Sequence, residues 1–411
     1  MVGHYEMLIE ELCTQREGSQ IVHFPKVIAS TATISRAREQ CKALYCRNTD
    51  EIFQFPPSGI SYRDSFFAEA DGSSDGRKYV GIFCSNLKYS AVTAVIRFYA
   101  DIAYARQHIV VSSEKNKDAY WTHVGYFNSI RELGRMKSYV TQEVGEYIKV
   151  LDDRYGTTGT INMLNDLELT SRIDSGEIPE ALKKLEIGYD PDKGGSIPID
   201  VCLASNMISV GIDVPRLGLM SVAGQPKTTS EYIQATSRVG RSLTPGLVFI
   251  IYTCTKPRDR SHYEQFQDYH SKIYCYVEPT SVTPFSGPVR ERALGALLVA
   301  YMRLRHPEIE KIKPIIPKDE WFDEFKSIVV SRAMDISPDE LDDTIANVDK
   351  LIQEWKRKNP EIFGNPYMKP KPNQLLTVRG EHSEYGYVIP TSMRSVDASC
   401  NLIELKAKYG K

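Results

Sequence analysis

The sequence lacks any strong imbalance of charge. Its 411 residues include 51 Lys and Arg against 53 Asp and Glu, which gives a formal net charge of −2. A protein that attracts nucleic acid over its whole surface is therefore excluded, and any contact with phosphates must come from a local patch. With 42% hydrophobic residues, the chain has room for two or three ordinary domains, each with its own core.

Long hydrophobic runs are also missing. No apolar stretch approaches the roughly 18 residues that span a bilayer. The N-terminus carries Glu6, Glu10 and Glu11, whereas a secretory signal begins with basic residues ahead of an apolar segment. We therefore expect no membrane association and a cytoplasmic location.

The eight cysteines form no C-x-x-C pair. Several lie in apolar runs, where cysteine behaves as a small hydrophobic residue, and we expect reduced thiols. A metal site built from Cys254, His262, His270 and Cys275 is conceivable. The spacing of these four residues is wide and irregular, so no metal site is predicted.

Two phosphate-handling features are absent. The sequence contains no G-x-x-x-x-G-K-[ST] loop, and we find no acidic strand end that would hold Mg²⁺. The nearest lookalike, at 71–78, has the wrong spacing and no Ser or Thr after Lys78. A polar loop is expected there.

Two segments about twenty residues apart carry the strongest pattern that is present. The first is an apolar strand from Leu203 that leads to Gly211 and Asp213. The second, 231–241, places Gln234, Arg238 and Arg241 at Q-x-x-x-R-x-x-R spacing, which puts all three on one face of a predicted helix. Two guanidinium groups directed the same way suit phosphate oxygens.

Buried strands alternate with helices through the middle of the chain. Near-continuous Val, Ile and Leu runs are expected as strands at 79–84, 121–127, 199–205, 217–223 and 246–253. This alternation predicts an α/β fold, a parallel sheet with helices on both faces. Its polar groups are expected at the carboxyl ends of the strands, where such sheets bind ligands. Helices at 289–305, 319–334 and 338–357 predict a mainly helical C-terminal accessory region.

The paired segments resemble motifs V and VI of a superfamily 2 helicase. Ser30-Thr-Ala-Thr33, expected after a buried strand at Val27–Ala29, is similar to motif III, and Asn128-Ser-Ile-Arg131 is similar to motif IV. The resemblance implies a RecA-like helicase C-terminal domain with ATP and Mg²⁺ as cofactors.

The same resemblance implies a role for each matching residue. Arg241 would be the arginine finger and Arg238 would hold the same phosphates. Nucleotide-binding roles fall on Gln234, Gly211 and Asp213, and coupling roles on Ser30, Thr31 and Thr33. The implied nucleic-acid contacts are Asn128, Arg131, Ser205 and Asn206. For Asn128 and Arg131 the plain alternative is a helix cap and a solvated side chain.

The order of segments over most of the chain also resembles the large helicase component of the DISARM anti-phage system. That resemblance implies ATP-dependent movement on DNA.

Four segments are predicted: a remnant of a first RecA-like domain (1–35), a connector with an insertion (36–117), the second RecA-like domain (118–256) and the accessory region (257–411). Because motifs I and II are missing, the chain is expected to start just after motif II. A motor half or another chain would then supply those motifs, and other defence subunits are possible partners.

Two further hypotheses stay open. The chain could be a non-catalytic nucleic-acid-binding or adaptor module that keeps the fold, or an unrelated nucleotide-binding enzyme. The second would need another catalytic constellation, and no H-E-x-x-H metal motif is present. Arg258, Arg260, His262 and Tyr263 mix stacking and phosphate-binding chemistry, although such residues more often form a surface between domains.

Overall fold

The chain forms two compact units in this computed structural model. The helical unit comprises Met1–Ser30, Arg36–Phe55 and Pro279–Lys411, and the sheet unit comprises Thr31–Ser35 and Pro56–Glu278. The structure describes residues 1–389 with gaps at 19, 58, 61–63, 66, 70–71, 73–74, 86–90, 111–113, 171, 174–175, 191–196, 210–212, 242–243, 310–313, 365–370 and 379–385. No described helix is long and apolar enough to cross a membrane.

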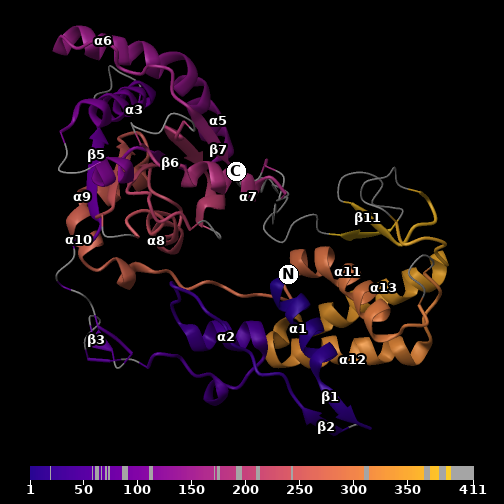
Figure 1. The fold of residues 1–411 in the computed structure, drawn as a ribbon. Coiled ribbons are helices and arrows are strands. Elements are labelled where there is room, and N and C mark those ends of the chain that lie inside the picture. Colours follow the sequence, from indigo (N-terminus) through magenta and orange to yellow (C-terminus); the bar gives the residue numbers. More distant parts are fainter. Residues whose placement is uncertain are drawn as a thin grey trace, which may run out of the picture. The chain divides into compact units, whose positions relative to one another are not determined.

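The sheet unit is built on a six-stranded parallel sheet (Figure 1). In spatial order the strands are β5 (Lys78–Cys84), β10 (Leu247–Thr253), β9 (Leu219–Ala223), β6 (His123–Phe127), β8 (Val201–Ala204) and β7 (Asp166–Leu169). Every residue of β6 and β8 is buried, which explains why their sequences are almost continuously apolar. The predicted parallel α/β sheet is confirmed.

Helices cover both faces of this sheet. On one face, α3 (Ala91–His108), α5 (Ile130–Tyr139) and α6 (Gly145–Tyr155) pack in a core that includes Val201 and Leu203 of β8. On the other face, α7 (Ile178–Glu186) and α8 (Thr229–Thr236) share a core with Cys202 and Ala204 of the same strand. Successive residues of β8 therefore serve opposite layers, as the two-residue period of a strand requires.

Short elements complete the sheet unit. They are β3 (Asp64–Ser65), β4 (Ala68–Glu69), α4 (Glu114–Ala119), the π-helix η2 (Val140–Val144), η3 (Asn206–Ser209), α9 (Pro257–Glu264), α10 (Phe266–Ser271) and η4 (Ile273–Tyr276). The compact units are divided near residues 55 and 278. The expected boundaries between segments of different function, at residues 35, 117 and 256, stay predictions.

Three long helices form the core of the helical unit. They are α11 (Gly287–Arg305), α12 (Asp319–Ile336) and α13 (Leu341–Lys358), close to the predicted ranges. The N-terminal helix α1 (Val2–Cys13) joins their core through Met7 and Leu8, which cluster with Leu297, Phe322 and Trp355. The smaller elements are β1 (Gln15–Glu17), β2 (Gln20–His23), α2 (Ala37–Tyr45), η1 (Thr49–Glu51), η5 (Pro338–Glu340), β11 (Leu376–Val378) and β12 (Tyr387–Ile389).

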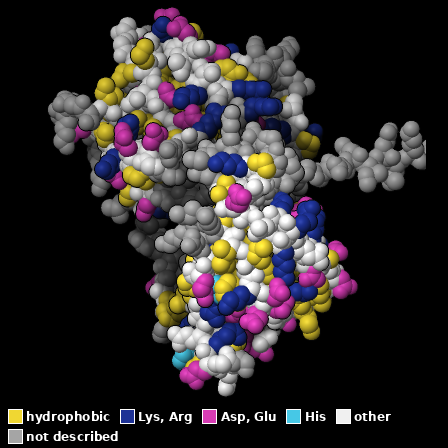
Figure 2. Space-filling view, turned by 90° about the vertical axis from the view of Figure 1, so that its right-hand side faces the viewer, with side chains coloured by type: hydrophobic (Ala, Val, Ile, Leu, Met, Phe, Trp, Pro, Cys, Tyr) yellow, Lys and Arg dark blue, Asp and Glu magenta, His cyan; other side chains and the backbone are white. Residues whose placement is uncertain are grey.

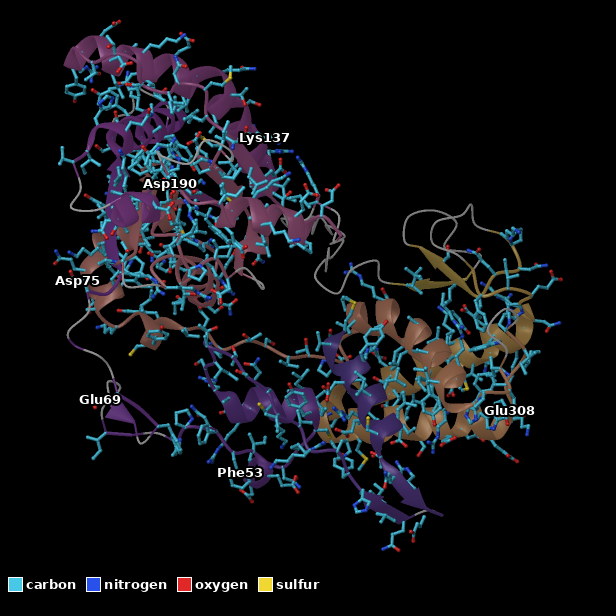
Figure 3. The ribbon with its side chains drawn as sticks, in the orientation of Figure 1. Phe53, Glu69, Asp75, Lys137, Asp190 and Glu308 are labelled. Atoms are coloured by element: carbon cyan, nitrogen blue, oxygen red, sulfur yellow. The ribbon has the colours of Figure 1, made fainter. Side chains whose placement is uncertain are left out.

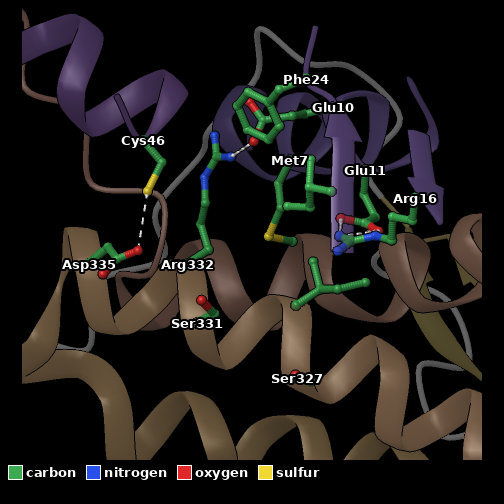
Figure 4. A pocket seen from close by; sticks show the side chains of 12 residues that line it. Met7, Glu10, Glu11, Arg16, Phe24, Cys46, Ser327, Ser331, Arg332 and Asp335 are labelled. Atoms are coloured by element: carbon green, nitrogen blue, oxygen red, sulfur yellow. Dashed lines mark hydrogen bonds and ion pairs between the residues drawn. The ribbon is translucent and has the colours of Figure 1, made fainter. Parts of the chain in front are cut away.

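A buried charge network fixes the N-terminal segment to α12 (Figure 4). Arg332 Nη1 donates to Glu10 Oε1 at 2.9 Å, and Arg47 pairs with the same carboxylate at 2.7 Å. Cys46 Sγ lies 3.8 Å from Asp335 Oδ2 beside a cavity of about 370 Å³. One carboxylate thus holds α1, the residues after α2, and α12 together.

The strand predicted at Val27–Ala29 is wrong. These residues have no regular secondary structure, and Ile28 is 86% exposed. A short apolar run becomes a strand only where another strand pairs with its backbone.

The seven described cysteines are free thiols, as expected. Only Cys202 is buried, so only this cysteine acts as a small hydrophobic residue of the core.

Candidate functional site

The two arginines of the predicted helix lie beyond its end. Helix α8 stops at Thr236, so Arg238 and Arg241 occupy the following turn, and the prediction of one helix over 231–241 is wrong. Gly240 fixes the turn that follows the helix: its φ is +67°, and a Cβ there would lie 2.4 Å from the backbone nitrogen of Gly246. The chain must leave the helix in order to enter β10.

This turn still brings the predicted charges together. Arg241 Nη1 donates to Asp213 Oδ1 at 2.7 Å, and Arg241 Nε donates to Ser237 O at 2.9 Å. Burial first, and then the charge of Arg241, lower the pKa of Arg238, while Asp213 opposes the shift. Arg241 is therefore paired with Asp213, and Arg238 lies close enough to both for each charge to shift its pKa.

A third arginine supports the turn and was missed from the sequence. Arg77, just before β5, donates from Nε to Val239 O at 2.7 Å and from Nη2 to Ser237 O at 3.3 Å. It lies about 160 residues away in sequence, in the loop at 71–78 that was expected to be merely polar. No local pattern could have revealed it.

The segment that resembles motif III meets helix α8 at one side chain. Gln234 Nε2 donates to Thr33 Oγ1 at 3.0 Å, and the backbone N–H of Thr33 donates to Thr31 Oγ1 at 3.3 Å. Ser30 and Thr31 are exposed, and Ser30 belongs to the helical unit. Gly211 lies outside the described residues.

The site residues divide between two opposite edges of the sheet. Arg238 and Arg241 precede β10, and Asp213 precedes β9, so these three lie toward the amino-terminal edge. Asn128 and Ser205 directly follow β6 and β8, at the carboxyl edge. The prediction that all polar groups lie at the carboxyl ends is therefore wrong for the arginines. The reason is that α8 connects two parallel strands, so its C-terminal end returns to the amino-terminal edge.

At the carboxyl edge, Asn128 holds a neighbouring loop. Its Nδ2 donates to Ala223 O at 3.0 Å and to Gly224 O at 3.2 Å. Ser129, not Asn128, caps α5, because its hydroxyl accepts from the backbone N–H of Glu132 at 3.2 Å. Arg131 is exposed in the first turn of that helix.

The loop after β8 and helix α9 complete this edge. Ser205 is buried, whereas Asn206 is exposed at the start of η3. The buried carboxylate of Asp259 accepts from the backbone N–H groups of Gln225 and Thr253, both at 3.0 Å. That anchor leaves Arg258 exposed on α9.

Charged side chains gather around α5. Lys256 Nζ lies 3.0 Å from Glu132 Oε1, which joins the start of α9 to α5. Lys137 projects from the same helix (Figure 3) and pairs with Glu168 at 3.2 Å. Figure 2, seen from the side on which α5 and α7 lie in Figure 1, shows Lys and Arg side chains gathered on the sheet unit. At the carboxyl edge itself, Arg131, Lys256 and Arg258 are exposed cations, and these three residues are called the carboxyl-edge patch below.

No group of three or more His, Cys, Asp or Glu side chains within the described ranges could hold a metal ion. The described residues thus offer no dedicated metal cluster, and the arginine turn presents cationic groups of the kind that bind anions.

Comparison with known proteins agrees with this geometry. The model of the helicase conserved C-terminal domain matches residues 180–242, the segment that contains Asp213, Gln234, Arg238 and Arg241. Over this segment the chain resembles the superfamily 2 helicases, and its six-stranded parallel sheet with helices on both faces is the RecA-like architecture expected of their C-terminal domain. It is 38% identical over 418 residues to the DISARM protein DrmA of Bacillus paralicheniformis (strain ATCC 9945a / NCIMB 11709 / CD-2). That match covers 97% of this chain and 36% of the relative, so the chain spans about a third of the relative's length.

Solved helicase structures are similar at low identity. The DUF1998 helicase MrfA bound to DNA and AMPPNP is 13% identical, with a TM-score of 0.45, over 74% of this chain and 33% of that one. Helicase Lhr of Mycobacterium smegmatis, bound to single-stranded DNA and AMP-PNP, is 13% identical, with a TM-score of 0.40, over 75% and 31%.

Proposed function

We propose that this chain is the C-terminal motor portion of an ATP-dependent DNA helicase or translocase that acts in phage defence. It supplies motifs III to VI and the arginine finger, and another polypeptide segment supplies motifs I and II. The observation that carries the proposal is the turn after α8, which brings Arg238 close to Arg241, whose guanidinium group is oriented by Asp213 and Ser237.

The arginine turn suits a nucleotide phosphate for electrostatic reasons. Arg241 is only 30% exposed and already oriented by Ser237 and Asp213, so little side-chain entropy remains to be lost when it binds an anion. A phosphate beside Arg238 would relieve the repulsion between the two guanidinium groups. Positive charge placed in advance stabilises the charge that develops during phosphoryl transfer.

ATP supplies the phosphoryl group, and Mg²⁺ would have to be held outside the described residues. This chain's part is to read the phosphates with Arg238 and Arg241. Gln234 and Thr33 would transmit the state of that turn to the motif III segment through their 3.0 Å hydrogen bond. Domain closure driven by nucleotide would then change the grip on DNA.

The carboxyl edge is the proposed nucleic-acid contact. Arg131, Asn206, Lys256 and Arg258 are exposed there, and the first turn of α5 presents backbone N–H groups. Phosphate contacts of this kind position a strand without reading its sequence. Asn128 and Ser205 would support this surface from behind.

The experiment is ATP hydrolysis by this chain combined with a polypeptide that carries a phosphate loop from the same family. Arg241→Ala should lower kcat of the combined motor by roughly 10³-fold, the range known for arginine fingers. Arg16→Ala is the matched control, because Arg16 belongs to the helical unit, is exposed and pairs with Glu11 at 2.7 Å. Unchanged turnover in Arg241→Ala would overturn the proposal.

The second candidate is a non-catalytic DNA-binding or adaptor module. It is favoured by the fact that Asp213 and Ser237 already satisfy part of the hydrogen-bonding capacity of Arg241. That reading predicts DNA affinity that nucleotide does not change and that survives substitution of both Arg238 and Arg241.

A further inference from the structure

A groove between α3 and α6 lies outside every segment that matches a helicase motif. Its volume is about 490 Å³. The side chains that line it from α3 are those of Asp101, Tyr104, Ala105 and His108, and those from α6 are Tyr147, Arg154 and Tyr155. These two helices pack on the face of the sheet opposite α8.

Three rings form a row along this groove. The centroids of Tyr104 and His108 are 4.3 Å apart with planes inclined by 31°, and those of Tyr104 and Tyr155 are 5.5 Å apart with planes inclined by 30°. Tyr155 ends the row and is 63% exposed. A tyrosine ring this exposed presents an open face to any flat partner.

Hydrogen bonds hold the inner rings in place. The hydroxyl of Tyr104 and that of Thr157 are 2.8 Å apart, and His108 Nε2 lies 2.8 Å from Thr160 Oγ1. Both threonine hydroxyls donate to Asp152 Oδ1, with the bond from Thr157 at 2.6 Å. The rings are thus fixed before any ligand arrives, which lowers the entropic cost of binding.

The remaining lining groups match a base joined to a phosphate. Arg154 supplies a guanidinium group to the lining, and Arg97, which does not line the groove, lies 5.4 Å from the ring centroid of Tyr147. The exposed carboxylate of Asp101 can accept hydrogen bonds from the amino or imino groups of a base. Ala105, between Tyr104 and His108 on the same helix, adds little bulk, so a flat ring can approach.

We propose that this groove stacks an unpaired nucleobase of single-stranded nucleic acid, a contact additional to those of the helicase motifs. The inference rests on the proposed function in one respect, that the protein handles nucleic acid. Tyr155 stacks on the base, Tyr104 and His108 support Tyr155 from behind, and Arg154 faces the phosphate. Aromatic rings beside a cationic group are how single strands are held without regard to sequence.

The test compares two 12-nucleotide single strands with the same number of phosphates. One is oligo-dT, and the other carries abasic residues throughout. Affinity is measured by fluorescence anisotropy with the 1–411 chain at fixed salt. Tyr155→Ala should weaken binding of oligo-dT about tenfold and leave binding of the abasic strand unchanged, because only a base can stack.

Two variants serve as controls. Tyr155→Trp keeps a flat ring and should bind oligo-dT as tightly as the parent chain or more tightly. Tyr274→Ala removes another tyrosine of similar exposure, 67%, from η4 and should change neither affinity. Circular dichroism confirms that each variant is folded.

The outcomes separate this inference from the proposed function. If Tyr155→Ala has no effect, or weakens both strands equally, while Arg131→Ala and Arg258→Ala still reduce binding, the stacking site is refuted and the proposed function stands. If the parent chain binds neither strand, both are refuted. A competition experiment asks whether the groove holds bases or the aromatic side chains of a protein. Unlabelled oligo-dT should displace the labelled oligo-dT from the chain, and a tryptophan-containing peptide should not. Displacement by the peptide and not by unlabelled oligo-dT would overturn the inference.

Discussion

The guanidinium group of Arg241 meets the carboxylate of Asp213 at 2.7 Å across 28 residues of sequence. Asp213 is 69% exposed, so the pair is screened by water and contributes little to folding. Its consequence is orientation: Asp213 and Ser237 together direct Arg241 beside Arg238. Conversion of Asp213 to Ala should change the free energy of unfolding by less than about 1 kcal/mol and should reduce the turnover of an assembled motor. Urea unfolding and ATP hydrolysis check the two parts, and a large loss of stability would contradict this account.

The backbone at Gly240 should tolerate no side chain. Gly240→Ala forces a Cβ to 2.4 Å from Gly246 N in a left-handed conformation. We expect a loss of roughly 2 kcal/mol or more in unfolding free energy, measured by urea denaturation. Gly134→Ala is the matched control, because Gly134 lies within α5 with open space around its Cβ position. That variant should gain about 0.5–1 kcal/mol, and equal effects at both positions would contradict the explanation for the turn after α8.

The buried pair of Glu10 and Arg332 should be costly to break. Arg332 and Glu10 have side chains only 7% and 10% exposed. Removal of Glu10 deprives both Arg332 and Arg47 of their carboxylate, whereas removal of Arg332 leaves Glu10 paired with Arg47. Glu10→Gln should therefore destabilise the helical unit by roughly 3 kcal/mol, and Arg332→Met by less. The double variant should lose less than the sum of the single losses. Additive losses in a double-mutant cycle would show that the two side chains act independently.

Two buried histidines should make stability fall in acid. Burial lowers the pKa of His4 to about 3, with the nearby positive charges adding to the shift, and burial also lowers the pKa of His123 to about 3. Since the folded pKa lies below the ordinary value of 6.5, stability is complete above pH 6.5 and declines as pH falls. Between pH 6.5 and 5 each residue should cost about 2 kcal/mol.

The pH dependence can be assigned to one residue with His4→Leu. His4 is fully buried in the helical unit and packs edge-on against Phe285 at 5.1 Å. The variant should flatten the loss of stability between pH 6.5 and 5, measured by urea unfolding at each pH. An unchanged pH profile would mean that His4 is not neutral and buried in solution.

The carboxyl-edge patch should act through charge. Arg131→Ala and Arg258→Ala should each weaken binding of single-stranded DNA and should each reduce the slope of log affinity against log salt by about one. Glu180→Ala, a change of charge at an exposed position of α7, should not lower affinity. A salt slope that stays the same in both arginine variants would place the nucleic acid elsewhere.

The sequence predicted five of the six strands of the sheet, but neither β7 (Asp166–Leu169) nor the position of the charges. Val, Ile and Leu runs predicted β6, β8, β9 and β10 because strands buried on both faces carry few polar residues. The spacing of Gln234, Arg238 and Arg241 predicted a single helical face, but α8 ends at Thr236, before both arginines, and Gly240 sets the turn that follows. The close approach of Gly240 to Gly246 is a tertiary contact, so helical periodicity cannot predict it.

Other features of the site depend on long-range contacts in the same way. Arg77 supports the arginine turn from the far end of the domain sequence, and only the pairing of β5 with β10 brings it there. Thr33 and Gln234 were each singled out by local motifs, but their hydrogen bond follows from the fold alone. Local pattern therefore identified the residue types, and strand order decided which of them meet.

The most direct test of the account is ATP hydrolysis by the purified 1–411 chain in the presence of saturating single-stranded DNA. The chain has two arginines that can read a phosphate but no phosphate loop in its sequence, so the account predicts no DNA-stimulated turnover above background. Turnover at several per second that disappears in Arg241→Ala would contradict it, because this chain would then hold a complete catalytic site of its own.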